Sequence, residues 1–192
     1  MKATNNGSLR KIPDCTIKIP GGNTSVAGSD LIIELNNLPD ISDGKSAVYN
    51  GESIIGRSFP LYTYSHSAER TISMQLHFFI VDPNDGVKNL NSLRAIQSAV
   101  YPRNGKQSQT PYQPPPVCKI KCGSLLDNDE LCCILQSYSV KFPTEVAWDE
   151  ATYCPYRFDV DTNWLVVYNT TSLPFQEDIL KAAQSRILTT NR

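Results

Sequence analysis

The amino-acid sequence predicts a mainly β fold with flanking helices (β+α). We expect a β-sandwich or partly closed barrel, with one helix between strands and one at the C-terminus. Three long stretches alternate apolar and polar residues, which is the period of a strand with one buried face. Two further stretches repeat apolar residues at helical spacing, one between the strands and one near the end of the chain.

The first long alternating stretch, residues 70–81, reads RTISMQLHFFIV. Its apolar positions are Ile72, Met74, Leu76, Phe78 and Ile80, and the intervening ones are Thr71, Ser73, Gln75 and His77. At about 3.3 Å per residue it would span roughly 35–40 Å, about twice the usual strand length. The polar face of so long a strand is therefore the main functional question.

Residues 1–29 are expected to form an N-terminal arm and a first short strand. Residues 1–10 are polar, as in a loose arm, and residues 15–19 predict a strand that ends at Pro20-Gly21-Gly22. Residues 30–35 predict a second strand. The main β domain is expected to span residues 30–172.

Residues 36–69 are weakly patterned and allow two interpretations, a surface loop or a projecting hairpin that contacts another subunit. Two dipeptides typical of hairpin turns, Asp43-Gly44 and Asn50-Gly51, occur here. About thirty residues of weak structure are unusual in a compact domain unless they work as an arm. Asp43, Gly44, Asn50 and Gly51 are therefore candidate inter-subunit residues.

The first helix is predicted at residues 89–101, where Leu90, Leu93 and Ile96 share one face. Pro102 would end it, and Asn84, Asp85 or Asn89 would cap its N-terminus.

Three more strands are predicted, at residues 117–122, 131–142 and 156–168. In the second, the predicted buried face comprises Ile134, Tyr138, Val140 and Phe142. In the third, the apolar positions are Tyr156, Phe158, Val160, Trp164, Val166 and Tyr168, and the polar positions are Arg157, Asp159, Asp161 and Asn163. The intervening loop is acidic and contains Trp148.

Residues 173–192 are expected to form a C-terminal helix and tail. The helical stripe within residues 174–188 comprises Ile179, Leu180, Ala183 and Ile187.

Composition excludes several function classes. The 192 residues carry 18 Lys and Arg against 19 Asp and Glu, which argues against a dedicated nucleic-acid binder. No apolar run approaches the ~20 residues that span a bilayer, so no membrane partner is expected. The first twenty residues lack the apolar segment of a secretory signal, so we expect synthesis in the cytoplasm and reduced cysteines.

No enzyme, cofactor or metal site is expected. Cys118, Cys122, Cys132 and Cys133 loosely resemble a zinc quartet, but their spacing differs from the C-x2-C of structural sites, which favours buried thiols. His77 has no second histidine placed to assist it, and the sequence holds no phosphate-loop, dinucleotide or hydrolase motif. The pair Asp159 and Asp161 is more typical of a solvated face than of a cation site.

The order of elements resembles a known family. The elements that carry the likeness are the strand at 70–81, the helix ending at Val100-Tyr101-Pro102, Pro114-Pro115-Pro116-Val117 with the strand closing at Gly123, residues 133–142, the Trp148 loop, and residues 156–168. This order resembles the tail tube superfamily of contractile phages over about residues 30–172. Within it, the chain looks closest to the baseplate proteins that cap the hub and start the tube, the tube initiators.

The resemblance implies a tail-tube-like domain in a hexameric ring whose long strands build one inner barrel. DNA and the tape-measure protein would pass through the lumen without specific binding, with the baseplate hub on one side and the tail tube or a second initiator ring on the other. The protein would be made in the host bacterial cytoplasm and reside in the virion. The polar positions Thr71, Ser73, Gln75, His77, Arg157, Asp159, Asp161 and Asn163 would line the lumen. A face with Arg157 as its one fixed cation suits a channel that must not bind the phosphates of the passing DNA.

Three alternatives stay open. The chain could instead be a main tail tube subunit or a neck-side tube terminator. A carbohydrate- or single-strand-nucleic-acid-binding module would instead use exposed aromatic side chains for stacking.

The C-terminal helix, with Ile179, Leu180, Ala183 and Ile187, is the expected contact with the hub or a neighbouring ring.

Overall fold

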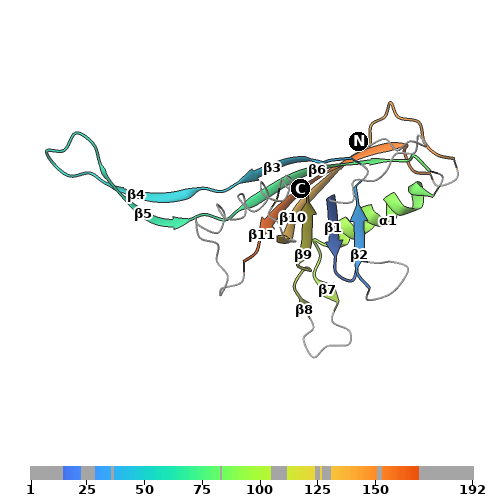
Figure 1. Cartoon of the computed structure of the whole chain (residues 1–192), viewed down its shortest axis with the longest axis horizontal. Coiled ribbons are helices and arrows are strands. Elements are labelled where there is room, and N and C mark those ends of the chain that lie inside the picture. The colour runs from blue at the N-terminus through green and yellow to red at the C-terminus, as the bar shows by residue number, and fades with distance from the viewer. Residues whose placement is uncertain are drawn as a thin grey trace, which may run out of the picture.

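The computed structural model describes residues 15–22, 29–35, 37–82, 84–104, 112–123, 126, 131–150 and 153–168. Its main feature is a seven-stranded antiparallel sheet in the order β2-β1-β9-β10-β11-β6-β3 (Figure 1). The strands are β1 (Cys15–Ile19), β2 (Leu31–Glu34), β3 (Asp40–Gly44), β6 (Thr71–Phe79), β9 (Cys118–Cys122), β10 (Leu131–Lys141) and β11 (Arg157–Val166). The helix α1 (Asp85–Ser98) packs against β2 and β6. The predicted mainly β fold with a flanking helix is confirmed.

The core lies on the face of the sheet that α1 covers. The alternation predicted for the first long stretch is confirmed, since Ile72, Met74, Leu76 and Phe78 of β6 are buried. From β11, Phe158 stacks on Phe78 with the ring centroids 4.9 Å apart. The three long strands are neighbours in the sheet, so their apolar faces form one continuous surface.

The helix begins four residues before the predicted start. The Asp85 carboxylate accepts the backbone N–H groups of Val81 (3.3 Å) and Asp82 (3.0 Å), which ties the first turn to the end of β6. Asn84 occupies the N-cap position without a side-chain cap bond. Asn89, a predicted cap candidate, lies inside the helix and donates its amide to the Phe79 carbonyl oxygen at 3.0 Å.

A β-bulge in β10 corrects the predicted buried face of that strand. The register against β11 shifts between Leu135 and Ser137, so one residue is added and the parity of the side chains reverses. Before the bulge, Leu131, Cys133 and Leu135 are buried, whereas Tyr138 and Val140 pack on the core after it. Ile134 therefore lies on the opposite face from Tyr138, contrary to the prediction. Phe142 and Tyr156, both predicted to be buried, are exposed.

The expectation that all cysteines are reduced is wrong for one pair. Cys15 of β1 lies directly opposite Cys122 of β9, and the two form a disulfide. The register brings together residues 107 positions apart, which spacing along the chain does not reveal. Cys118 and Cys133 are buried, as predicted, and burial raises the pKa of the Cys133 thiol to about 12.

Residues 36–69 contain a second, two-stranded sheet, β4 (Ala47–Glu52) with β5 (Leu61–Ser67). It prolongs the β3–β6 pair into a long hairpin that projects from the main sheet (Figure 1). The two predicted turn dipeptides lie inside strands instead: Asp43-Gly44 ends β3, and Asn50-Gly51 belongs to β4. The hairpin turns at residues 53–60, where Gly56 has φ +88° and the Arg57 N–H donates to the Ile54 carbonyl oxygen.

A third small sheet pairs β7 (Arg103–Asn104) with β8 (Tyr112–Gln113). The predicted arm at residues 1–10 and the predicted helix at 174–188, with Ile179, Leu180, Ala183 and Ile187, lie outside the described residues. In the part of the chain that the structure describes, no helix has the length and apolar character needed to cross a membrane.

Candidate functional site

All eight residues predicted to form a polar face lie on one side of β6 and β11. Directly opposed residues of an antiparallel pair project to the same face, and the register opposes His77 to Asp159, Gln75 to Asp161 and Ser73 to Asn163. Thr71 and Arg157 lie at the two ends of the same face. This surface, on the side of the sheet away from the core, is called the polar face below.

The neighbouring strands add residues that sequence reasoning missed. From β3, Asp40 lies beside Gln75 and Ser42 beside Ser73. From β10, Ser137 and Lys141 lie beside Asn163 and Asp159. The alternation of Ser137, Ser139 and Lys141 could have revealed the polar residues of β10 from the sequence. In contrast, β3 is too short for its pattern to be recognised.

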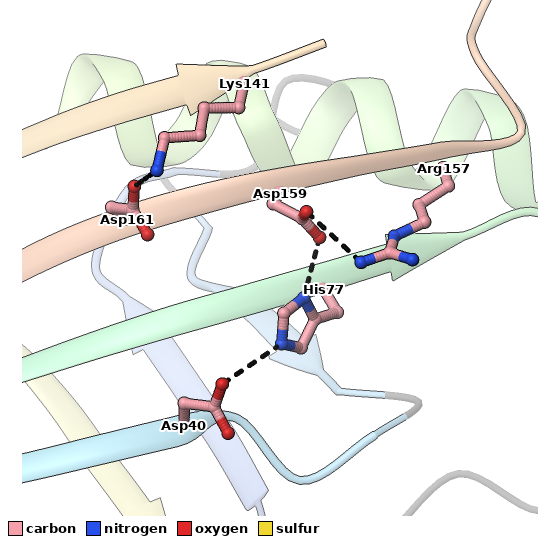
Figure 2. A network of polar contacts seen from close by, with 6 residues as sticks. All are labelled: Asp40, His77, Lys141, Arg157, Asp159 and Asp161. Carbon is pink, nitrogen blue, oxygen red and sulfur yellow. Dashed lines mark hydrogen bonds and ion pairs between the residues drawn. The ribbon is translucent and has the colours of Figure 1, made fainter. Parts of the chain in front are cut away.

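His77 lies between two carboxylates, as Figure 2 shows. Its Nδ1 is 2.6 Å from Oδ1 of Asp159, and its Nε2 is 3.8 Å from Oδ2 of Asp40. Because an ionised carboxylate can only accept, Nδ1 carries the proton and donates to Asp159. The His77 side chain is 18% exposed and Asp159 14%, so this hydrogen bond is partly shielded from solvent.

Asp159 is held in its charged form by its neighbours. Burial alone would raise its pKa, but the hydrogen bond from His77 and the Arg157 guanidinium outweigh burial and lower the pKa below its usual value. Nη2 of Arg157 is 3.4 Å from Oδ2 of Asp159. Both oxygens of this carboxylate therefore have partners.

The rest of the polar face is also paired internally. Lys141 forms an ion pair with Asp161 at 3.0 Å (Figure 2). The Ser73 hydroxyl donates to Oδ1 of Asn163 at 2.7 Å, and Nδ2 of Asn163 donates to the Ser137 hydroxyl at 3.0 Å. Lys141 corrects the expectation that Arg157 is the one fixed cation here, yet each of these two cations contacts an aspartate.

A shallow groove of about 370 Å³ crosses the sheet between these rows. It is lined by Asp40, Ile41, Ser42, Ser73, Met74, Gln75, Asp161, Thr162 and Asn163. None of these is aromatic, so the groove lacks the stacking platform that bases or sugars require.

The polar face has no arrangement suited to nucleophilic catalysis. Both ring nitrogens of His77 face carboxylates, and the Ser73 hydroxyl donates to Asn163 instead of to the imidazole. Among the described residues, no group of three or more His, Cys, Asp or Glu side chains is placed to hold a metal ion. The arrangement instead fixes charges in pairs along the polar face.

The predicted inter-subunit residues lie along the hairpin and at its base. Asp43 accepts a fork of hydrogen bonds from Arg70, with 2.6 Å from Nη2 to Oδ2 and 3.0 Å from Nε to Oδ1. Gly44 lies opposite Thr71, and the Asn50 carbonyl oxygen accepts from the Thr63 hydroxyl. These contacts brace the hairpin from within.

The side chains of β4 and β5 are exposed throughout. Tyr49, Tyr62 and Tyr64 share one face, with the rings of Tyr49 and Tyr64 edge to face at a centroid distance of 5.8 Å. Gly51 lies under Tyr62, where an added Cβ would be 3.2 Å from Cε1 of the ring. An isolated two-stranded ribbon is only marginally stable in water, so this tyrosine face is suited to being covered by a partner.

We compared the chain with known proteins. No protein-family model matches the sequence, and no curated protein matches it.

Proposed function

We propose that this chain is a structural virion protein that forms a hexameric ring of the central tube in a contractile phage tail. Its place would be at the baseplate, as the tube initiator that joins the hub to the tail tube. The observation that carries the proposal is the projecting hairpin β4–β5, whose tyrosine face finds no cover in the described part of its own chain. Tyrosine is enriched at protein interfaces, which supports a partner subunit at this face.

The edges of the main sheet support assembly as well. Within the described residues, β2 pairs with β1 alone and β3 with β6 alone, so each leaves one edge open. Open edges are templates for pairing with another chain. If β3 of one copy meets β2 of the next, the contact is head-to-tail, and a rotation of one sixth of a turn per copy would close it into a ring of six with continuous sheets.

The polar face suits the lumen of such a ring. Each free Lys or Arg that contacts a phosphate adds affinity through counterion release. On β6, β10 and β11 the fixed cations Arg157 and Lys141 are each paired to an aspartate, and Asp40 adds a further carboxylate. DNA and a tape-measure protein would therefore slide past this surface without being held.

The same assembly would also suit a main tail tube subunit or a neck-side terminator, which differ in position along the tail. A function of another class, binding of carbohydrate or single-stranded nucleic acid, is favoured by the exposure of Tyr49, Tyr62 and Tyr64, because exposed aromatic rings stack on bases and sugars.

Light scattering with negative-stain imaging of the same fraction tests the proposal. Ring formation predicts a mass of six chains and six-fold rings or short stacked tubes. A monomer that binds an oligosaccharide or oligothymidine saturably, and loses that binding in Tyr62→Ala, would replace the ring by the binding-module function.

A further inference from the structure

A second group of exposed aromatic side chains lies at the opposite end of the main sheet from the hairpin. The hairpin joins β6 at Thr71, whereas this group surrounds the far end of β6 and the turn between β10 and β11 (Figure 1). Its members are Phe142, Trp148, Tyr153 and Tyr156, and Tyr153 is 81% exposed. We call these four residues the aromatic end.

The loop that carries the aromatic end is held by its own backbone. The Asp149 N–H donates to the Cys154 carbonyl oxygen, and the Tyr153 N–H donates to the Asp149 carbonyl oxygen, both at 2.9 Å. Trp148 and Pro155 form an isolated antiparallel β-bridge. Tyr153 has φ +53°, a left-handed conformation that a bulky residue rarely adopts. These backbone contacts hold residues 148–149 against residues 153–155, and the side chains of Trp148 and Tyr153 are exposed.

The tip of the hairpin is apolar and basic. Ile54, Ile55 and Phe59 are exposed there, Ile55 completely, and Arg57 lies among them. The loop of the aromatic end carries the opposite charge, since Glu145 and Glu150 are exposed in it. The two ends of the molecule thus combine apolar side chains with complementary charges.

We propose that the hairpin tip of one copy docks onto the aromatic end of the next copy. Ile55 and Phe59 pack against Trp148 and Tyr153, and Arg57 lies between the glutamates. This inference rests on the proposed function in taking a second copy of the chain as the partner. Because the two surfaces differ, the contact is head-to-tail, so it extends through successive copies instead of ending at a dimer.

Charge reversal tests this contact directly. Arg57→Glu places a third acid against Glu145 and Glu150, and Glu145→Lys with Glu150→Lys places two cations against Arg57. Like charges facing one another at an interface oppose association. We expect each change to raise the protein concentration at half-assembly by roughly tenfold or more, and the two changes combined to restore most of that loss.

The matched control is Arg94→Glu, at an exposed residue of α1 that belongs to neither surface, which should assemble as the wild type does. Mass by light scattering and symmetry by negative stain are read from each variant, with circular dichroism to verify folding. The contact is supported if assembly is weakened in each charge-reversal variant and recovers when the two are combined.

An unchanged concentration at half-assembly in Arg57→Glu, with six-fold rings still formed, would reject this contact while leaving the ring proposal intact. If the charge reversals change assembly as expected but the assemblies lack six-fold symmetry, the contact is supported and the ring proposal is rejected. A wild-type chain that stays monomeric at its solubility limit would overturn the contact, and flotation with phosphatidylglycerol vesicles that Ile55→Asp abolishes would assign the tip to a lipid surface.

Discussion

A partly buried ion pair between Arg70 and Asp43 lies at the base of the projecting hairpin. Side-chain exposure is 11% for Arg70 and 33% for Asp43, and the guanidinium contacts both carboxylate oxygens. Nη1 of Arg70 also donates to the Tyr168 hydroxyl at 3.4 Å. The pair thus joins β3 to the start of β6 and reaches the residues that follow β11.

Replacing Arg70 by methionine keeps the apolar stem and removes the hydrogen-bond fork. A hydrogen bond to a charged group contributes about 1.5–3 kcal/mol, and the Asp43 carboxylate left behind regains part of its hydration because it is one-third exposed. We therefore expect Arg70→Met to lower the free energy of unfolding by about 2–3 kcal/mol. Amides of β4 and β5 should exchange faster than those of β9, because the hairpin loses its anchor first.

Lys18→Met is the matched control. Lys18 pairs with Asp30 at 3.1 Å, but both side chains are more than a third exposed, so the change should cost about 0–1 kcal/mol. Urea unfolding gives the two free energies, and a double-mutant cycle with Asp43→Asn isolates the coupling. Equal losses in the two methionine variants, or a coupling near zero, would refute the argument that burial makes the Arg70 pair the stronger one.

Three further predictions concern the polar face, the core and the disulfide. The pKa of Asp159 is lowered in the folded state, so its charge stabilises the fold above its unfolded pKa of about 3.9, and this contribution is lost as pH falls through the folded value. The difference in unfolding free energy between wild type and Asp159→Asn should accordingly shrink as the pH falls below about 4; a difference that stays the same across that range would contradict it. Leu76→Ala should cost about 2–5 kcal/mol because the side chain is fully buried, whereas the adjacent Gln75→Ala on the polar face should cost about 0.5 kcal/mol or less in the same denaturation series. Reducing the Cys15–Cys122 disulfide should lower the free energy of unfolding by up to about 4–5 kcal/mol through loop-closure entropy, because the bond links residues 107 apart. The stability of the control Cys15→Ser should not change with reductant. A wild type whose stability is equally unchanged would argue that the bond does not form.

Periodicity along the chain was enough to predict the long strands and the buried side of β6 and β11. Each of these strands alternates apolar and polar residues along most of its length, and burial of one face demands that pattern wherever the strand lies. The eight polar-face residues could be named for the same reason. Helix α1 was found from its apolar spacing, but its first turn was not, because Asp85-Gly86 has the composition of a turn until the Asp85 carboxylate meets the backbone at the end of β6.

Other features depend on which strands become neighbours, and no local pattern records that. The bulge between Leu135 and Ser137 reverses the parity of β10 only in its register with β11. Asp43-Gly44 and Asn50-Gly51 have turn composition, yet they lie within strands, because β3 pairs with Thr71–Gln75 of β6 and β4 pairs along the length of β5.

The charge pairs of the polar face arise in the same way. Asp40 reaches His77 from β3, and Lys141 reaches Asp161 from β10, across sequence separations that no spacing rule covers. The sequence by itself thus determined which side chains are polar and which face of β6 and β11 they occupy, because that follows from the two-residue period of a strand. Only the tertiary structure decided which of them meet, because strand order and register are set by packing over the entire sheet.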